Sequence, residues 1–278
     1  MIQYLSQLRH VLDHGVEKRD RTGVGVLSCF GLQARYDMRD GFPAVTTKQL
    51  VWKSMVSELL WFISGSGNIN ELKGIYPGNK LWDGNYADYL DRIGLSENDG
   101  AMGRIYGTQW RSWQGAEREV DQLQEAIDTI TRDPGSRRMV VNAWNPAETG
   151  PKEVALPPCH AFYQFYVAGG ALSLQMYQRS CDMFLGVPLN IASYSLLLHI
   201  VARITGLKPR EFVHTLGDAH IYLDHVDAVK EQLSRDPHPL PQLEIVDRGQ
   251  TTIDDFEFGD FSLLNYVHHP AIRAKMAV

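Results

Sequence analysis

The chain has 278 residues, of which 44% are apolar, and it carries a formal net charge of −6 at pH 7. This length and apolar content suit one α/β domain with a substantial core. The acidic balance excludes a general attraction to nucleic acid or anionic membranes, so an anionic ligand must meet a local cluster of arginines.

The first part of the chain combines helical periodicity with a glycine-rich segment. Apolar residues from Ile2 to Leu12 fall on one helical face, and Gly15 follows as a natural stop. Residues 24–36 mix β-branched, aromatic and glycine residues, which predicts strands broken by a turn or bulge. A second helix is predicted over residues 53–62.

The middle of the chain is less periodic. Several glycines and a Pro-Gly pair between residues 65 and 115 predict a turn-rich excursion from the main core. A helical pattern returns over residues 120–130 and ends before another Pro-Gly pair. Strands are predicted over residues 138–144 and 160–167.

The last part of the chain predicts a hairpin, a buried helix and a further helix. A Gly-Gly pair at 169–170 stands between two strand patterns, which predicts antiparallel neighbours. Residues 191–204 are apolar around most of the helix circumference but too few to cross a membrane, so we expect the central core helix. Asp218 is expected to cap a helix extending to Val229, and a strand follows at 243–246.

Several functional classes lack support. Three cysteines without a Cys-x-x-Cys pair are too few for a disulfide framework, and free thiols imply a reducing compartment. No complete dinucleotide fingerprint, phosphate-binding Gly-Lys-Ser/Thr loop or His-Glu-x-x-His motif occurs. The N-terminus also has no apolar signal core. We therefore expect a cytoplasmic protein that uses no metal.

Cys159 is a candidate nucleophile because two prolines precede it and a predicted strand follows, which places its thiol at a rigid boundary. Taken alone, a cysteine is more often an inert core thiol. A thiolate needs a positive neighbour. The adjacent His160 is one candidate, although successive strand residues point to opposite faces. Arginines at loop edges are better candidates, and together they suit a phosphate: Arg21, Arg137, Arg138 and Arg179.

Other polar residues have both structural and chemical interpretations. Asn190 either caps the buried helix or offers an amide donor and an acceptor side by side, a pattern that can read the edge of a base. Glu58 either lies on the polar face of its helix or is a buried proton shuttle with a raised pKa. His220 and Tyr222 are either ordinary residues of a helix or ligands of a sugar hydroxyl.

Longer motifs identify a family. They include Asp20-Arg21-Thr22-Gly23, Glu58-Leu59-Leu60-Trp61-Phe62, Pro158-Cys159-His160-Ala161-Phe162, Tyr177-Gln178-Arg179-Ser180, Asn190-Ile191-Ala192-Ser193-Tyr194 and the tail Met276-Ala277-Val278. With these motifs the chain resembles the thymidylate synthases from nearly its first residue to its last.

The resemblance implies an α/β fold of the α+β type, with one domain over residues 1–278 and a large mixed sheet flanked by helices. It also implies a homodimer joined through sheet faces. The implied reaction is the reductive methylation of dUMP to dTMP. In it Cys159 adds to C6 of uracil, 5,10-methylenetetrahydrofolate donates the one-carbon unit and the hydride, and dihydrofolate is released. No membrane, required nucleic acid or metal is expected as a partner.

The resemblance also assigns roles to residues. The implied catalytic set is Cys159, Glu58, Tyr106 and Asn190. The implied dUMP ligands are Arg21, Arg137, Arg138, Gln178, Arg179, Ser180, Asp182, Asn190, His220 and Tyr222, with Arg137 and Arg138 supplied by the partner subunit. The implied folate contacts are Trp82, Asp182, Leu185, Gly186 and Ala277. Gln49 stands where the family usually has a basic residue, which predicts weaker affinity for polyglutamate tails.

Two alternative functions stand beside this interpretation. A related pyrimidine nucleotide hydroxymethylase makes the same folate adduct but lets water capture the exocyclic methylene. Trp82 and the C-terminal tail argue against it because both would exclude water, and Asn190 favours uracil over cytosine. The second alternative is a catalytically silent relative that only binds ligands. The intact set Cys159, Arg179, Asn190 and His220 argues against that.

Overall fold

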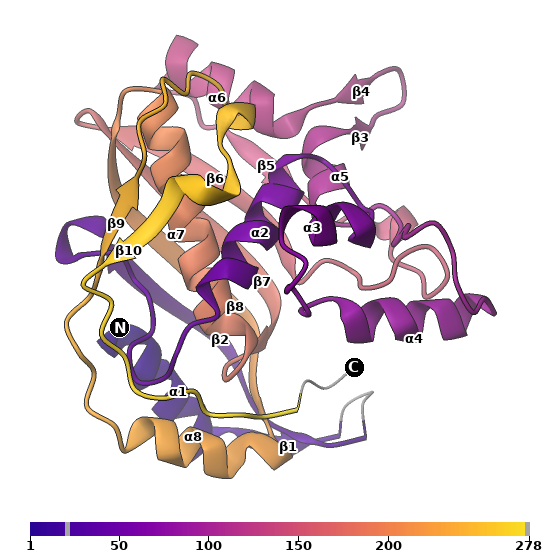
Figure 1. Cartoon of the computed structure of the whole chain (residues 1–278), viewed down its shortest axis with the longest axis vertical. Coiled ribbons are helices and arrows are strands. Elements are labelled where there is room, and N and C mark those ends of the chain that lie inside the picture. Colours follow the sequence, from indigo (N-terminus) through magenta and orange to yellow (C-terminus); the bar gives the residue numbers. More distant parts are fainter. Residues whose placement is uncertain (20–22, 276–278) are drawn as a thin grey trace.

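The computed structural model describes residues 1–19 and 23–275 of the chain. Within this part, a mixed six-stranded sheet has the order β1-β2-β8-β7-β6-β5. Its strands are β1 (Val16–Lys18), β2 (Val26–Asp37), β5 (Val140–Asn142), β6 (His160–Ala168), β7 (Ala171–Asp182) and β8 (Lys208–Tyr222). β7 and β8 are parallel, and the other neighbours are antiparallel. This sheet with its helices confirms the predicted fold class (Figure 1).

The remaining elements cover one side of the sheet or extend from its ends. The helices are α1 (Ile2–His14), α2 (Trp52–Ile63), α3 (Ile69–Ile75), α4 (Asp83–Ile93), α5 (Tyr106–Arg111), α6 (Gln122–Arg132), α7 (Gly186–Ile204) and α8 (Val226–Leu233). Two small antiparallel pairs join β3 (Trp113–Gln114) to β4 (Glu119–Val120) and β9 (Gln242–Ile245) to β10 (Phe261–Leu264). The predicted helices at α1, α2 and α6, and the strand at β9, are confirmed.

The turn between β6 and β7 follows the sequence prediction. Gly169 and Gly170 have φ angles of 57° and 73°, which suit a two-residue hairpin turn that needs positive φ at both positions. Ala168 and Ala171 pair directly beside it. The predicted antiparallel hairpin is therefore confirmed.

Helix α7 connects the parallel strands β7 and β8 through the core. It begins at Gly186, before the predicted start at residue 191, because Pro188 lies in the first helical turn, where proline is tolerated. Its 19 residues are long and apolar enough to cross a membrane by length and composition, which corrects the expectation of a shorter helix. Most of α7 is buried inside the protein, so its apolar character is explained by core packing.

Strand β8 is the largest departure from the sequence prediction. The prediction that Asp218 caps a helix is wrong, because this residue lies within β8 and its carboxylate accepts a hydrogen bond from Ser28 at 2.6 Å. Lys18 forms an ion pair with the same carboxylate. The following α-helix begins only at Val226. Because β8 has buried residues on both faces, its sequence lacks the alternation that would identify a strand.

Two more predicted elements change in extent. Residues 26–37 form one continuous strand, and Gly31, with a φ of 83°, lies where the pairing with β8 skips a residue. Residues 65–115 are more helical and more buried than a turn-rich excursion. Figure 1 shows α4 as the outer helix of this segment. Side chains of the segment that belong to the core are Ile69, Leu72, Trp82, Tyr89, Met102, Ile105, Tyr106 and Trp110.

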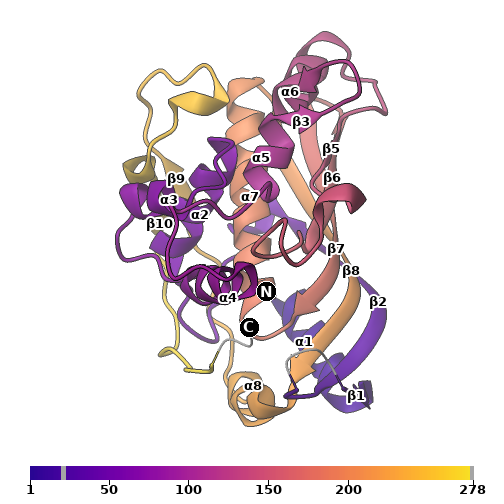
Figure 2. The same cartoon turned by 90° about the vertical axis from the view of Figure 1, so that its right-hand side faces the viewer.

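The sheet has one side that no helix of the described chain covers. Figure 2 shows α2, α5 and α7 together on the other side of the strands. On the uncovered side, Phe162 stacks on Tyr177 of the neighbouring strand, and Gln33 donates to the Thr215 hydroxyl. Tyr166 is 64% exposed. We call these five residues the open sheet face. Exposed aromatic residues grouped on one face are typical of a protein-binding surface.

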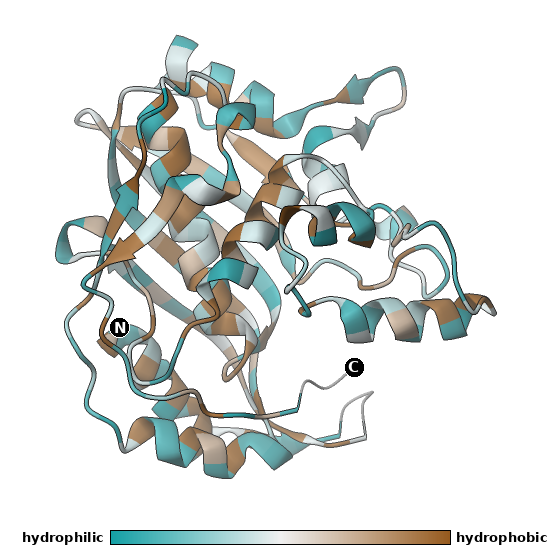
Figure 3. Cartoon of the chain, in the orientation of Figure 1, coloured by the Kyte–Doolittle hydropathy of each residue, from teal (hydrophilic) through white to brown (hydrophobic). Residues whose placement is uncertain are grey.

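Packing between α2 and α5 requires a glycine at position 107. Figure 3 shows apolar residues along most of α2. A Cβ at position 107 would lie 2.5 Å from the Phe62 carbonyl oxygen and 2.8 Å from its Cα. We therefore expect Gly107→Ala to lower the free energy of unfolding by about 1–3 kcal/mol, as measured by urea denaturation. Gly74→Ala is the matched control, since a Cβ there meets nothing within 4 Å. Equal stability of the two variants would contradict this argument.

Candidate active site

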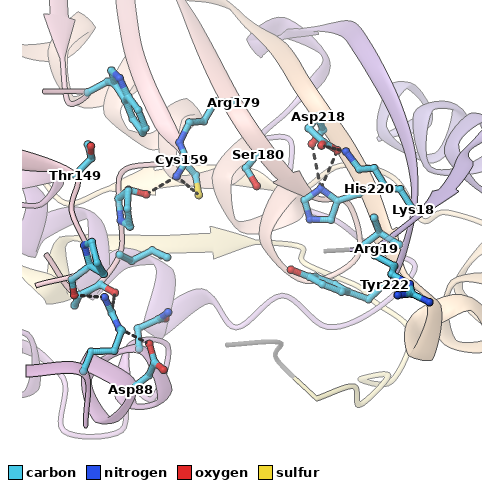
Figure 4. A pocket seen from close by; sticks show the side chains of 18 residues that line it. Lys18, Arg19, Asp88, Thr149, Cys159, Arg179, Ser180, Asp218, His220 and Tyr222 are labelled. Carbon is cyan, nitrogen blue, oxygen red and sulfur yellow. Dashed lines mark hydrogen bonds and ion pairs between the residues drawn. The ribbon is translucent and has the colours of Figure 1, made fainter. Parts of the chain in front are cut away.

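A pocket opens where β7 and β8 end side by side. It consists of a cavity of about 680 Å³ and a smaller one of about 220 Å³. The residues that line both cavities are Asn85, Leu156, Cys159, Ser180, His220 and Tyr222. The two cavities are therefore parts of one pocket. Figure 4 shows the labelled side chains of the larger part.

Cys159 directly precedes β6, and its backbone is held on both sides. Its N–H donates to the Tyr106 hydroxyl at 2.8 Å, and its carbonyl accepts the N–H of Arg179 at 2.8 Å. The first bond ties the residue to the start of α5 and the second to strand β7. The thiol is partly exposed and lines the pocket. It is thus a positioned thiol in a cavity wall, unlike an inert thiol of the core.

The guanidinium of Arg179 lies beside this thiol (Figure 4). Its Nη2 is 4.0 Å from the Cys159 Sγ. Its Nε and Nη2 also donate to the carbonyls of Pro158 and Pro157 at 2.9 and 2.8 Å. The Trp144 ring packs on the guanidinium, with 4.8 Å between Cζ and the ring centroid. The loop that carries the nucleophile therefore also fixes a positive charge next to it.

His160 does not supply the positive charge that its position beside Cys159 suggests. Its ring is buried between Tyr106 and Tyr194, at centroid distances of 5.0 and 5.1 Å. Burial lowers the pKa of His160 to about 4. The ring is neutral at pH 7, so the positive charge that the described structure places beside the thiol is the Arg179 guanidinium.

Glu58 extends from α2 into the wall of the smaller cavity. Its Oε1 accepts a hydrogen bond from the Trp82 indole N–H at 2.7 Å. Burial raises the pKa of Glu58 to about 7, and the Trp82 hydrogen bond opposes part of that rise. The interpretation as a solvated helix face is therefore wrong. A carboxyl group with a pKa near 7 exchanges its proton readily at neutral pH.

Asn190 is held by side chains from the neighbouring strand. It lies inside α7 and does not cap that helix, which corrects one of the two interpretations. Its Oδ1 accepts a hydrogen bond from Gln178 Nε2 at 3.0 Å. Gln178 Oε1 lies 2.9 Å from Nε2 of His214 in β8. The sequence prediction missed His214 because β8 itself was not predicted as a strand.

His220 and Tyr222 come from β8, and Ser180 from β7, so they are strand residues and not residues of a helix. The His220 and Tyr222 rings meet edge to face, with 5.3 Å between centroids. His220 Nδ1 lies 3.1 Å from the Asp218 carbonyl oxygen. These polar groups face the same space as Cys159 (Figure 4).

The start of α7 forms another part of the wall. Asp182 ends β7, and its Oδ1 accepts the N–H groups of Phe184 and Leu185 at 2.9 and 3.1 Å. This turn brings Leu185 and Gly186 to the smaller cavity, whose lining also includes Trp82. Leu189 follows one helical turn later in the same wall. The cavity thus combines apolar surface with two carboxyl groups, those of Asp182 and Glu58.

Some predicted site residues do not join the pocket. Arg137 and Arg138 lie between α6 and β5 and are absent from the lining of both described cavities. Arg21 and Ala277 lie outside the described residues. Gln49 is exposed.

Two basic residues that the sequence prediction missed, Lys18 and Arg19, do line the larger cavity. Their position just before the Asp20-Arg21 motif was the available signal.

Comparisons with known proteins agree along the whole chain. The family model described as thymidylate synthase matches residues 2–278. The chain is 52% identical over 288 residues to the thymidylate synthase of Homo sapiens, which covers 100% of this chain and 90% of the human protein. It is also 52% identical over 287 residues to the thymidylate synthase of equine herpesvirus 2 (strain 86/87), with 99% and 98% coverage. Among residues 1–19 and 23–275, no group of three or more His, Cys, Asp or Glu side chains is arranged to hold a metal ion.

Proposed function

Because this chain belongs to the thymidylate synthase family, we propose that it converts dUMP to dTMP by reductive methylation. The one-carbon unit and the hydride come from 5,10-methylenetetrahydrofolate, and dihydrofolate is the second product. The observation that carries the proposal is the Cys159 thiol, which lines the pocket 4.0 Å from the Arg179 guanidinium. A nearby guanidinium favours the thiolate form, which is the nucleophile.

The larger cavity suits the nucleotide. Arg179 and Arg19 give it a basic wall for the phosphate, and Lys18, which is paired with Asp218, lies in the same lining. Nε and Nη2 of Arg179 donate hydrogen bonds to the carbonyls of Pro158 and Pro157, so Nη1 is the nitrogen that can bind a phosphate oxygen. His220 and Tyr222 supply hydrogen-bonding groups for the deoxyribose hydroxyl. The uracil then lies between Cys159 and Asn190, which line the smaller cavity together.

The proposed chemistry begins when the Cys159 thiolate adds to C6 of uracil. A sulfur–carbon bond forms, and the electron pair of the C5–C6 double bond moves toward C5 and O4. Asn190 stabilises the charge on O4 through its amide N–H. Glu58 and Tyr106 carry the proton transfers, including removal of the C5 proton after the one-carbon unit has joined C5. Removal of that proton would let the bond between the one-carbon unit and the folate nitrogen break, and a hydride would then pass from the folate to the one-carbon unit. Loss of the Cys159 sulfur from C6 restores the C5–C6 double bond and the thiolate.

The smaller cavity fits the ring system of a folate. Trp82, Leu185 and Leu189 give apolar contact, and the Asp182 carboxylate can accept an N–H of the pterin. When bound there, 5,10-methylenetetrahydrofolate supplies the methylene group and the hydride beside the uracil. Trp82 and Leu185 would keep water from the exocyclic carbon, which favours a methyl product over a hydroxymethyl product.

Incubation of the protein with dUMP and 5,10-methylenetetrahydrofolate tests this function. The expected result is dTMP in equal amounts with dihydrofolate, followed by the absorbance change of the folate. Hydroxymethylated nucleotide without oxidised folate would identify the hydroxymethylase instead. No product, together with no covalent adduct to 5-fluoro-dUMP in the presence of the folate, would identify a silent relative.

We also propose that two copies join through the open sheet face. The exposed aromatic residues Phe162 and Tyr166 support this, because a second copy would remove them from water. The positions of Arg137 and Arg138 support it as well, since their own pocket does not use them. In such a dimer these two arginines would bind the phosphate in the partner's pocket.

Mixed dimers test this arrangement. Arg138→Ala and Cys159→Ala are each expected to be nearly inactive, whereas subunit exchange between them should restore one intact site in every mixed dimer. Random exchange of equal amounts makes half of the dimers mixed, so about one quarter of native activity per site is expected. The control is each variant taken alone through the same exchange procedure. Failure of the mixture to recover activity would contradict arginine donation across the interface.

A cytoplasmic location is also proposed. The described cysteines are all free thiols: Cys29, Cys159 and Cys181. Free thiols persist in a reducing compartment, and the proposed thiolate nucleophile requires one of them to stay reduced.

A further inference from the structure

Three buried polar side chains form a hydrogen-bonded chain from β8 through β7 to α7. His214 Nε2 lies 2.9 Å from Gln178 Oε1, and Gln178 Nε2 lies 3.0 Å from Asn190 Oδ1. Their exposed fractions are 0%, 3% and 9%. Gln178 and Asn190 line the smaller cavity of the described structure, whereas His214 does not. His214 therefore reaches the pocket only through Gln178.

The backbone fixes the direction of this chain. Gln178 Nε2 also lies 3.0 Å from the Ser180 carbonyl oxygen, which can only accept a hydrogen bond. The amide nitrogen of Gln178 must therefore face Ser180 and Asn190, and its oxygen must face His214. Since that oxygen also only accepts, His214 must carry its proton on Nε2. Asn190 then receives an N–H at Oδ1, which directs its own amide nitrogen away from Gln178.

His214 stays in one protonation state over the useful pH range. Burial, with a smaller contribution from the nearby His160, lowers the pKa of His214 to about 3. Its Nδ1 is buried without a hydrogen-bond partner in the described structure. A proton on Nδ1 would leave both that proton and the Gln178 oxygen unpaired. The neutral imidazole with its proton on Nε2 therefore leaves fewer buried polar atoms without a hydrogen bond.

We propose that His214 is a positioning residue that holds Asn190 in the orientation suited to uracil and thereby disfavours cytosine. This inference rests on the proposed function. Uracil offers an acceptor at O4 and a donor at N3, which match the N–H and the remaining lone pair of the Asn190 amide. Cytosine offers the reverse pattern. An Asn190 amide rotated to match cytosine would direct its nitrogen at Gln178 Nε2, so two donors would face each other.

Substitution of His214 tests the proposal. His214→Phe keeps a ring against Phe212 but removes the donor. His214→Gln is the matched variant, because a glutamine amide nitrogen can occupy the place of Nε2. The readouts are the dissociation constants of dUMP and dCMP, measured by calorimetry on the full-length protein. We expect His214→Phe to reduce the preference for dUMP over dCMP roughly 5- to 100-fold, since a buried acceptor is left unpaired. We expect His214→Gln to restore most of it.

A purely structural role would weaken both nucleotides equally, so an unchanged preference in His214→Phe would overturn the proposal. If that variant does not fold, His214→Asn removes the donor in the same way, because its shorter side chain cannot reach Gln178. Nitrogen-15 NMR of the native protein offers an independent check. A proton on Nε2 is expected, and a proton on Nδ1 would overturn the proposal. Native protein that makes no dTMP would instead contradict the proposed function.

Discussion

Cys159→Ala is expected to lower kcat for dTMP formation by roughly 10⁴-fold or more, with the affinity for dUMP nearly unchanged. Alanine removes the sulfur that forms the bond to C6, and no other described cysteine lines either cavity. The basic wall around Arg179 stays in place to bind the phosphate. Steady-state kinetics and dUMP calorimetry separate the two effects.

Cys29→Ala is the matched control for this variant. Cys29 is a partly buried thiol in β2, away from the pocket lining, so activity within about twofold of native is expected. Mass spectrometry adds a direct test. Native protein incubated with 5-fluoro-dUMP and the folate should gain a covalent adduct that Cys159→Ala lacks. An adduct of equal amount in Cys159→Ala would exclude Cys159 as the nucleophile.

Glu58→Gln is expected to lower kcat by roughly 10²- to 10⁴-fold, because glutamine keeps the shape of the side chain but cannot transfer a proton. The Trp82 hydrogen bond can persist to the amide oxygen, so the cavity wall should stay intact. Glu71→Gln is the control, since Glu71 lies exposed on α3. Near-native kcat in Glu58→Gln would remove Glu58 from the proton transfers.

The pH dependence of kcat/KM provides a second test of the role of Glu58. With its pKa raised to about 7, Glu58 is neutral below that pH and ionised above it. A neutral carboxyl can donate a proton toward the charge on O4, whereas a carboxylate would repel that charge. We therefore expect kcat/KM of the native enzyme to fall as pH rises through 7. Glu58→Gln should lack this inflection, and an unchanged profile would contradict the assignment.

The raised pKa of Glu58 also makes the free energy of unfolding depend on pH. Burial raises the pKa of Glu58 from 4.5 to about 7, so between these values the folded protein holds a proton that the unfolded chain has released. The contribution of Glu58 to the free energy of unfolding is fully present below pH 4.5 and is lost as the pH rises through 7. This loss amounts to about 3 kcal/mol at most. Urea denaturation should show a smaller loss in Glu58→Gln over that range.

Local patterns predicted the elements whose sequence signal is complete within a few residues. Helix α1 has one apolar face and a terminal glycine, and the β6–β7 hairpin has its Gly-Gly pair. β8 could not be predicted in this way because buried residues lie on both of its faces, which removes the alternation. The predicted start of α7 at residue 191 is too late because the first helical turn accepts Pro188.

The site was predictable as a set of residues but not as a geometry. The position of Cys159 between two prolines and a strand pointed to a rigid thiol, yet its neighbours come from distant parts of the chain. Tyr106 and Arg179 reach it from α5 and β7. His214 carries no local signal, because it acts through Gln178 on the adjacent strand.

The pairing of β2 with β8 also has a consequence for synthesis of the chain. β2 leaves the ribosome early, but the strand that pairs with most of its length ends at Tyr222. At about 5–20 residues per second, roughly 10 to 40 seconds separate the two strands. During this time β2 and then β7 expose unpaired edges, which are prone to aggregation. Nascent chains that stop before Lys208 lack the strand between β2 and β7, so they should require chaperones or be degraded.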